Sequence, residues 1–259
     1  MIHYKTPQEI EIMRQGGKIL AEVLREVLSH VKPGVTELEL DSLAHRLITE
    51  KGAEPAFKKV KGYKYATCIS TNKAVVHGIP TEYKLKEGDI IGIDCGVVYK
   101  GFNTDMSETR RVSTINNQQS TSDKYEEIDK FLETGKKALN EAIKVANAGN
   151  RVGHISKKIQ DIVESEGYSV VRSLIGHGIG KKLHEDPEVP GFLDKKLEKT
   201  SILKPGMTIA IEIIYNMGEA EVSYSNNDGW TIVTKDGSLS GLFERSIAIT
   251  KRGPVILTE

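Results

Sequence analysis

Hydrophobic side chains recur at helical spacing in two stretches of each half of the chain. In the first half they fall on one side of about residues 7–30, and a helix to about residue 51 is indicated by the capping-box pair Thr36 and Glu39. The second half repeats this arrangement over about 125–145 and 152–166. The pattern therefore predicts two pairs of amphipathic helices.

Apolar runs and alternating stretches follow each helix pair and predict β-strands. The predicted strands are about 67–70, 90–98, 107–112, 208–214, 230–234 and 245–250. A polar stretch, 114–123, has the composition of a linker between the two halves. In the second strand, Asp94 projects on the same side as Gly92 and Gly96, whereas the apolar residues between them point the other way. The small neighbours leave space beside this carboxylate.

An internal repeat relates the two halves. Residues 85–94 recur 118 positions later as 203–212, and both copies end in an acid, Asp94 and Glu212. The isoleucines that alternate with Glu212 fill the opposite, core-facing side of its strand. Two similar halves, each with two helices followed by strands, would bring the two acids face to face across a pseudo-twofold axis.

Length and charge limit the class of protein. A chain of 259 residues can form one large domain with a substantial core, so we predict a single domain, 1–259, with halves of about 1–113 and 124–259. Lys plus Arg equal Asp plus Glu at 36 each, which argues against binding to nucleic acid or an anionic membrane. No apolar run indicates a signal peptide or a membrane span, so a cytoplasmic location is expected. The lysine-rich segment 58–61 favours a solvated loop over a ribosome or RNA contact.

The chain has two cysteines, Cys68 and Cys95. Cys95 lies among apolar residues and is expected to be a small buried core residue. A disulfide is not expected in a reducing compartment.

Four acids lie in otherwise apolar or glycine-rich stretches, and they precede or follow a Gly-His-Gly motif that contains His177. These acids are Asp94, Asp105, Glu212 and Glu244. Burial of ionised carboxylates costs several kcal/mol or more unless a cation balances them. Their own segments supply only Arg245, whereas two divalent ions would neutralise all four. Oxygen ligands with one imidazole suit manganese, iron, cobalt or zinc, so the set predicts a two-metal hydrolase site.

Taken together, these residues resemble the type I methionine aminopeptidases, which are pita-bread metallopeptidases. The matching segments are 68–72, 77–80, the pair Asp94 and Asp105, 176–180, 184–187 and 228–231. The resemblance spans nearly the whole chain. It implies an α/β (α+β) pita-bread fold, with two pseudosymmetric halves and a central antiparallel sheet that is covered by helices.

The resemblance also implies ligand roles. Asp94 should chelate one metal ion, Asp105 and Glu244 should bridge both ions, and His177 with Glu212 should hold the second. The expected cofactors are two divalent ions of manganese, iron, cobalt or zinc.

The implied activity is removal of the N-terminal methionine from nascent proteins and peptides, with a preference for a small second residue. Glu212 would move the proton, and His77 and His184 would contact the substrate and stabilise the oxyanion. The substrate pocket would be formed by Tyr63, Cys68, Leu183, Ile214 and Trp230, together with these histidines. The expected partners are polypeptide N-termini, with at most a transient ribosome contact, and the expected state is a monomer.

This chain departs from the family pattern beside two of the expected ligands. It reads Ile-Glu-Ile-Ile at 211–214, where the family usually reads Ile-Glu-Pro-Met, and Glu-Arg-Ser at 244–246, where Glu-His-Thr is usual. Arg245 is expected to point away from Glu244 within a strand. Two alternatives remain: a proline-specific aminopeptidase or prolidase of the same fold, whose extra N-terminal domain has no room here, and a non-catalytic peptide-binding module of this fold.

Overall fold

The structure is a computed structural model, and it describes residues 2–114, 123–225 and 228–259. The predicted helices are confirmed. They are α1 (Pro7–Ser29), α2 (Glu37–Glu50), α3 (Asp123–Val145) and α4 (Val152–Ser165), with two short 3-10 helices, η1 (Phe57–Lys59) and η2 (Leu197–Lys199). The predicted capping box begins α2: Thr36 Oγ1 accepts a hydrogen bond from Glu39 N at 3.1 Å, and Glu39 Oε2 accepts one from Thr36 N at 2.7 Å. Within the described residues, no helix is both long and apolar enough to cross a membrane.

The strands are more numerous than the sequence predicted. They are β1 (Glu54–Pro55), β2 (Thr67–Thr71), β3 (Ala74–Val76), β4 (Ile90–Tyr99), β5 (Phe102–Arg111), β6 (Ser169–Val170), β7 (Ile175–Gly178), β8 (Glu185–Pro190), β9 (Thr208–Asn216), β10 (Val222–Tyr224), β11 (Ile232–Thr234), β12 (Ser240–Thr250) and β13 (Gly253–Ile256).

Two predicted strand starts were wrong by five residues. β5 begins at Phe102 rather than at 107, and β12 begins at Ser240 rather than at 245. Pairing with β4 and β9 extends both strands through polar or glycine-containing sequence, which local propensity alone does not favour. Asp105 and Glu244 therefore lie inside strands. Most of the predicted linker, residues 115–122, lies outside the described part of the chain.

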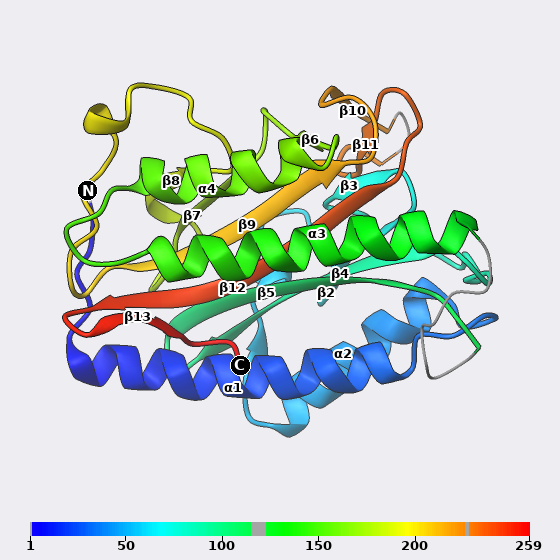
Figure 1. Ribbon diagram of the computed structural model, residues 1–259. Helices are drawn as coiled ribbons and strands as arrows, with labels where there is room; N and C mark the ends of the chain where they lie inside the picture. The colour runs from blue at the N-terminus through cyan, green and yellow to red at the C-terminus, as the bar shows by residue number, and fades with distance from the viewer. Residues whose placement is uncertain (1, 115–122, 226–227) are drawn as a thin grey trace.

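The main sheet is antiparallel, with the central strand order β4-β5-β12-β9. β2 pairs with β4 on one side, and β7 pairs with β9 on the other. The strands from the first and second halves of the chain thus meet between β5 and β12 (Figure 1). A separate three-stranded sheet, β10-β11-β3, also joins segments from both halves.

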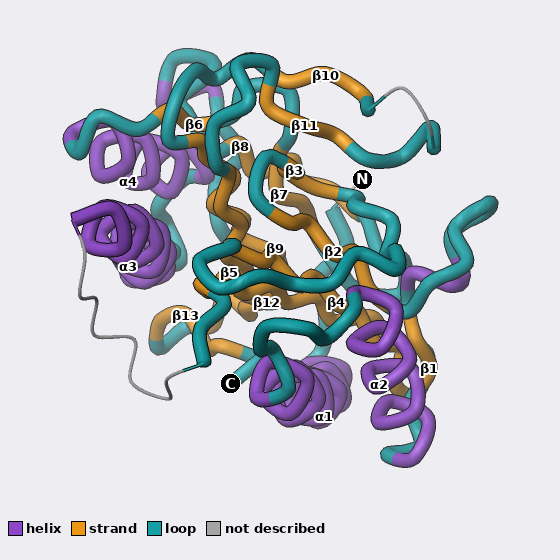
Figure 2. The backbone as a smooth tube through the Cα atoms, turned by 90° about the vertical axis from the view of Figure 1, so that its right-hand side faces the viewer, coloured by secondary structure: helices purple, strands orange, loops and turns teal. Residues whose placement is uncertain are grey.

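The four long helices cover one face of the main sheet (Figures 1 and 2). Ile91, Ile93 and Cys95 of β4 are buried in a core cluster with α1 and α2, as predicted for Cys95. Ile209 and Ile211 of β9 are buried in a second cluster with α3 and α4. Each such side chain contributes about 1.5–3 kcal/mol when it is fully buried. Because side chains alternate along a strand, the intervening acids project from the opposite face.

Candidate metal centre and substrate pocket

A cavity of about 340 Å³ lies on the face of the sheet opposite the helices. It is lined by every residue to which the sequence analysis gave a role. These are Tyr63, Cys68, His77, Asp94, Asp105, His177, Leu183, His184, Glu212, Ile214, Trp230 and Glu244. They come from strands and loops of both halves of the chain, so the fold gathers them into one place.

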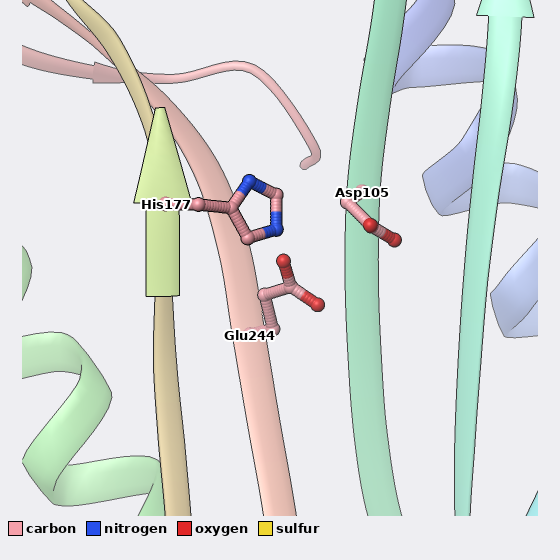
Figure 3. Close-up of side chains that lie close together, drawn as sticks. All are labelled: Asp105, His177 and Glu244. Atoms are coloured by element: carbon pink, nitrogen blue, oxygen red, sulfur yellow. The ribbon is translucent and has the colours of Figure 1, made fainter. Parts of the chain in front are cut away.

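Asp105, His177 and Glu244 form a close cluster in the cavity. One ligand atom from each lies within 4.8 Å of the others. Figure 3 shows the three side chains, which come from β5, β7 and β12, with the His177 ring beside the Glu244 carboxyl group. The carboxyl groups of Asp94 and Asp105 lie close enough to influence each other's pKa, and Glu212 Oε1 lies 3.5 Å from His177 Nε2. The five expected ligands are therefore contiguous.

Burial of four neighbouring carboxyl groups disfavours their charged forms. It raises the pKa of Asp94 to about 7 and raises the pKa values of Asp105, Glu212 and Glu244 well above their usual range. Mutual repulsion adds to this effect at Asp105. Among the described residues, Asp94 Oδ1 and Glu244 Oε1 are buried oxygens without a hydrogen-bond partner. Such acceptors are costly in a folded protein, and divalent cations would satisfy them, so the residues fit a metal site.

His177 has the form that a metal ligand requires. Its Nδ1 lies 2.9 Å from the carbonyl oxygen of Gly178, which can only accept, so Nδ1 carries the proton and Nε2 keeps its lone pair. Burial, together with nearby His184, lowers the pKa of His177 to about 4 and keeps the ring neutral at pH 7. A side chain at Gly178 would place its Cβ 2.1 Å from the carbonyl oxygen of Asp186. The Gly-His-Gly motif therefore lets β7 fit closely against β8.

His77 and His184 line the cavity from two loops. His77 has a left-handed backbone (φ 56°), and a Cβ on the following Gly78 would lie 1.9 Å from the carbonyl oxygen of Ile69. The His184 ring centroid lies 4.4 Å from that of His177. Burial lowers the pKa of both His77 and His184, which favours neutral rings at pH 7.

A buried ion pair anchors the loop that carries His184. Glu185 Oε2 lies 2.5 Å from Lys5 Nζ, and Glu185 Oε1 accepts a hydrogen bond from Lys182 N at 3.0 Å. Lys5 was not predicted from the sequence, because nothing local links it to a residue 180 positions away.

The apolar end of the cavity is built around Tyr63. Its ring meets that of Trp230 edge to face at 5.1 Å, and its hydroxyl donates to the carbonyl oxygen of Thr67 at 2.8 Å. Burial raises the pKa of the Cys68 thiol, so it stays protonated and apolar. Several other lining residues were not predicted from the sequence, and these are Val76, Ser173, Leu174, Ile175 and Leu242. Leu242 lies two positions before Glu244, in the part of β12 that the predicted strand did not reach.

Arg245 points away from the acids, as predicted. Its Nη2 lies 2.8 Å from Glu108 Oε2, and its Nη1 donates to the carbonyl oxygens of Ser107 and Glu244. The guanidinium group therefore links β5 to β12 and does not occupy the candidate metal centre.

Comparison with known proteins identifies the family. The model of metallopeptidase family M24 matches residues 11–251. A methionine aminopeptidase from Clostridium perfringens is 44% identical over 258 residues, which cover 100% of this chain and 99% of that protein. The crystal structure of methionine aminopeptidase from Thermotoga maritima matches with a TM-score of 0.92 and 41% identity, and all of both chains is covered. Prolidase from Pyrococcus horikoshii matches with a TM-score of 0.75 and 25% identity over 99% of this chain but 63% of its own. The chain has the pita-bread fold that these proteins share, and it belongs to metallopeptidase family M24 and, within that family, to the methionine aminopeptidases.

Proposed function

We propose that this protein is a metal-dependent aminopeptidase that removes the N-terminal methionine from nascent proteins and peptides and prefers a small second residue. The observation that carries the proposal is the juxtaposition of four buried carboxyl groups and a neutral imidazole with an apolar pocket. The full-length similarity to methionine aminopeptidases supports the same activity.

We infer that the site holds two divalent ions of manganese, iron, cobalt or zinc. Asp94 would chelate one, Asp105 and Glu244 would bridge both, and His177 with Glu212 would hold the second. The unpartnered oxygens of Asp94 and Glu244 support this assignment, as does the protonation of His177 at Nδ1. When bound, such ions supply Lewis-acid catalysis: they polarise the scissile carbonyl and lower the pKa of water.

Three side chains of the protein would then handle the substrate and the proton. Glu212, at the edge of the cluster, takes a proton from the attacking water and passes it to the leaving amine. His77 and His184, neutral at pH 7, each offer one N–H group to the substrate carbonyl oxygen as negative charge develops there.

Methionine specificity follows from the apolar end of the cavity. Cys68, Tyr63 and Trp230 offer a thiol and two aromatic rings, against which a flexible thioether packs well. Leu183 and Ile214 complete this lining. A bulky second residue would collide with the wall that carries His77, which gives the preference for a small residue at that position.

The proposal extends to the setting of the reaction. Residues 1–259 would form one catalytic domain, with halves of about 1–113 and 124–259. Because one chain supplies every proposed site residue, a monomer is sufficient to form the site. The substrates would be nascent polypeptides in the cytoplasm, with at most a transient ribosome contact.

A panel of short peptides tests this function directly. With manganese or cobalt added, we expect mass spectrometry to show release of methionine from Met-Ala and Met-Gly peptides and little from Met-Leu or Met-Lys peptides. N-acetylated peptides should not be cleaved, because they lack the free amine that positions the scissile carbonyl. Preference for Xaa-Pro bonds would favour a prolidase-like activity, which the structural similarity to prolidase makes the main alternative. No hydrolysis with two metal ions bound would favour a peptide-binding module.

A further inference from the structure

The regular pairing between β5 and β12 is very short. It comprises Glu244 with Ser107 and Arg245 with Met106, whereas β4 pairs with β5 along its whole length. These two strands carry Asp105 and Glu244, and they meet at the boundary between the two halves of the chain.

On each side of this short pairing, a side-chain hydroxyl takes the place of a backbone partner. Two residues before Glu244, Leu242 of β12 lies opposite Thr109 of β5. Thr109 Oγ1 accepts a hydrogen bond from Leu242 N at 2.9 Å and donates one to Leu242 O at 2.7 Å. Two residues after Glu244, Ser246 of β12 lies opposite Asp105 of β5. Ser246 Oγ accepts a hydrogen bond from Asp105 N at 2.9 Å and donates one to Asp105 O at 2.8 Å. Each hydroxyl thus satisfies both backbone groups of the residue opposite while occupying the space between the strands.

We propose that Ser246 and Thr109 are positioning residues for the metal centre. Their hydroxyls act as spacers that hold β5 and β12 apart on either side of Glu244 and so fix the separation of the Asp105 and Glu244 carboxyl groups. The clearest support is at Asp105, whose N–H and C=O groups both bond to Ser246. This proposal rests on the metal-binding role proposed for Asp105 and Glu244.

Ser246 is itself held in place by the C-terminal segment. Its N–H group donates to Thr258 Oγ1 at 3.1 Å, and its carbonyl oxygen accepts from Leu257 N at 2.9 Å. α1 packs against this segment so closely that a Cβ at Gly17 would lie 2.2 Å from the carbonyl oxygen of Leu257. Ser246 is fully buried. Its backbone groups hydrogen-bond to the C-terminal segment, and its hydroxyl hydrogen-bonds to β5.

The test compares Ser246→Ala, Ser246→Thr and Ser240→Ala with the wild-type protein. Ser240 is a matched control because it is a buried serine of the same strand, and its hydroxyl donates to Tyr215 O at 3.2 Å, outside the cavity lining. Calorimetry measures the stoichiometry and affinity of Mn²⁺ binding, and visible absorption of bound Co²⁺ reports the ligand geometry. We expect Ser246→Ala to weaken binding of the more weakly held ion by about 10- to 100-fold and to change the cobalt spectrum. Ser246→Thr, which keeps the hydroxyl, and Ser240→Ala should match the wild type.

Wild-type affinity and spectrum in Ser246→Ala would overturn the proposal, as would equal weakening in Ser240→Ala. If Ser246→Ala fails to fold, Thr109→Val provides the second test, because it removes the other hydroxyl while nearly preserving the shape of the side chain. It should also weaken metal binding, and unchanged binding would overturn the proposal. Failure of the wild-type protein to bind two ions would instead overturn the metal centre itself, so the two failures are distinguishable.

Discussion

The two halves of the sheet present matching acids but different third strands. β4 and β9 carry Asp94 and Glu212 at corresponding positions of the repeat, and the adjacent strands β5 and β12 carry the other two acids. In the first half, Ser70 of β2 lies opposite Gly92. In the second half, His177 of β7 lies opposite Ala210, which corresponds to Gly92 in the repeat.

This difference shows how a nearly symmetric frame can hold an asymmetric site. The pair β4 and β5 in the first half has its counterpart in β9 and β12 in the second, so both halves of the sheet supply carboxylates. The third strands differ at one corresponding position, where β2 has the hydroxyl of Ser70 and β7 has the imidazole of His177. Only the second half therefore offers a nitrogen atom to the site. In the proposed centre, the ion held by Asp94 therefore has only oxygen ligands, and the ion held by His177 has a mixed set.

Loss of either proposed bridging acid should have the largest effect, because in the proposed centre the two halves share both ions. Asp105→Ala and Glu244→Ala should each lower kcat/KM on a Met-Ala peptide by at least about 1,000-fold, since Lewis-acid catalysis is worth several kcal/mol. Circular dichroism should show that the fold is retained. Two bound ions with near-normal turnover in either variant would rule out the dinuclear mechanism.

His177→Ala and Ser70→Ala probe the asymmetry between the halves. Removal of the proposed nitrogen ligand should weaken the binding of one metal ion by at least about 100-fold, whereas removal of the Ser70 hydroxyl should leave metal binding unchanged. Equilibrium dialysis with metal analysis measures both. Equal losses in the two variants would contradict the difference drawn between the third strands.

His77→Ala and His184→Ala separate metal binding from catalysis. Both variants should keep two metal ions, and each should lower kcat by about 100-fold through loss of a hydrogen-bond donor to the developing oxyanion. Steady-state kinetics and metal analysis on the same samples check this. Loss of a metal ion from His184→Ala would show that the ligand assignment is wrong.

A further prediction concerns the stability of the metal-free protein, which should depend on pH through Asp94. Burial raises the pKa of Asp94 to about 7 in the native protein, whereas in the unfolded chain its pKa is about 4. Over this range the native state binds more protons than the unfolded state, so stability should fall as pH rises from about 4 to 7. Urea unfolding with a chelator present, compared with Asp94→Asn at each pH, isolates this contribution. A wild-type stability that rises relative to Asp94→Asn would contradict the pKa shift.

The sequence predicted the helices better than the strands, because helix signals are local. Amphipathic spacing and the pair Thr36 and Glu39 indicated α2 almost to the residue. β7 and β8 were missed because their glycine-rich and polar sequences become strands only through pairing with each other and with β9. The same dependence on pairing explains the misplaced start of β5.

The residues of the candidate site could be identified from sequence, but their contacts could not. The motifs singled out His177, yet the hydrogen bond to Gly178 that fixes its tautomer depends on the local conformation of β7. The ion pair between Lys5 and Glu185, and the hydroxyl of Ser246 beside Asp105, join positions that are distant in sequence. Periodicity carries no signal for such pairs.

The proposed metal-dependent cleavage is tested by measuring methionine release while metal is restored to the metal-free protein. Mn²⁺ is added stepwise, and each sample is assayed for bound metal and for cleavage of a Met-Ala peptide. We expect no methionine release without metal, rising activity as the site fills, and two ions per chain at saturation. Methionine release by the metal-free protein, or none from a protein with two bound ions, would contradict this proposal.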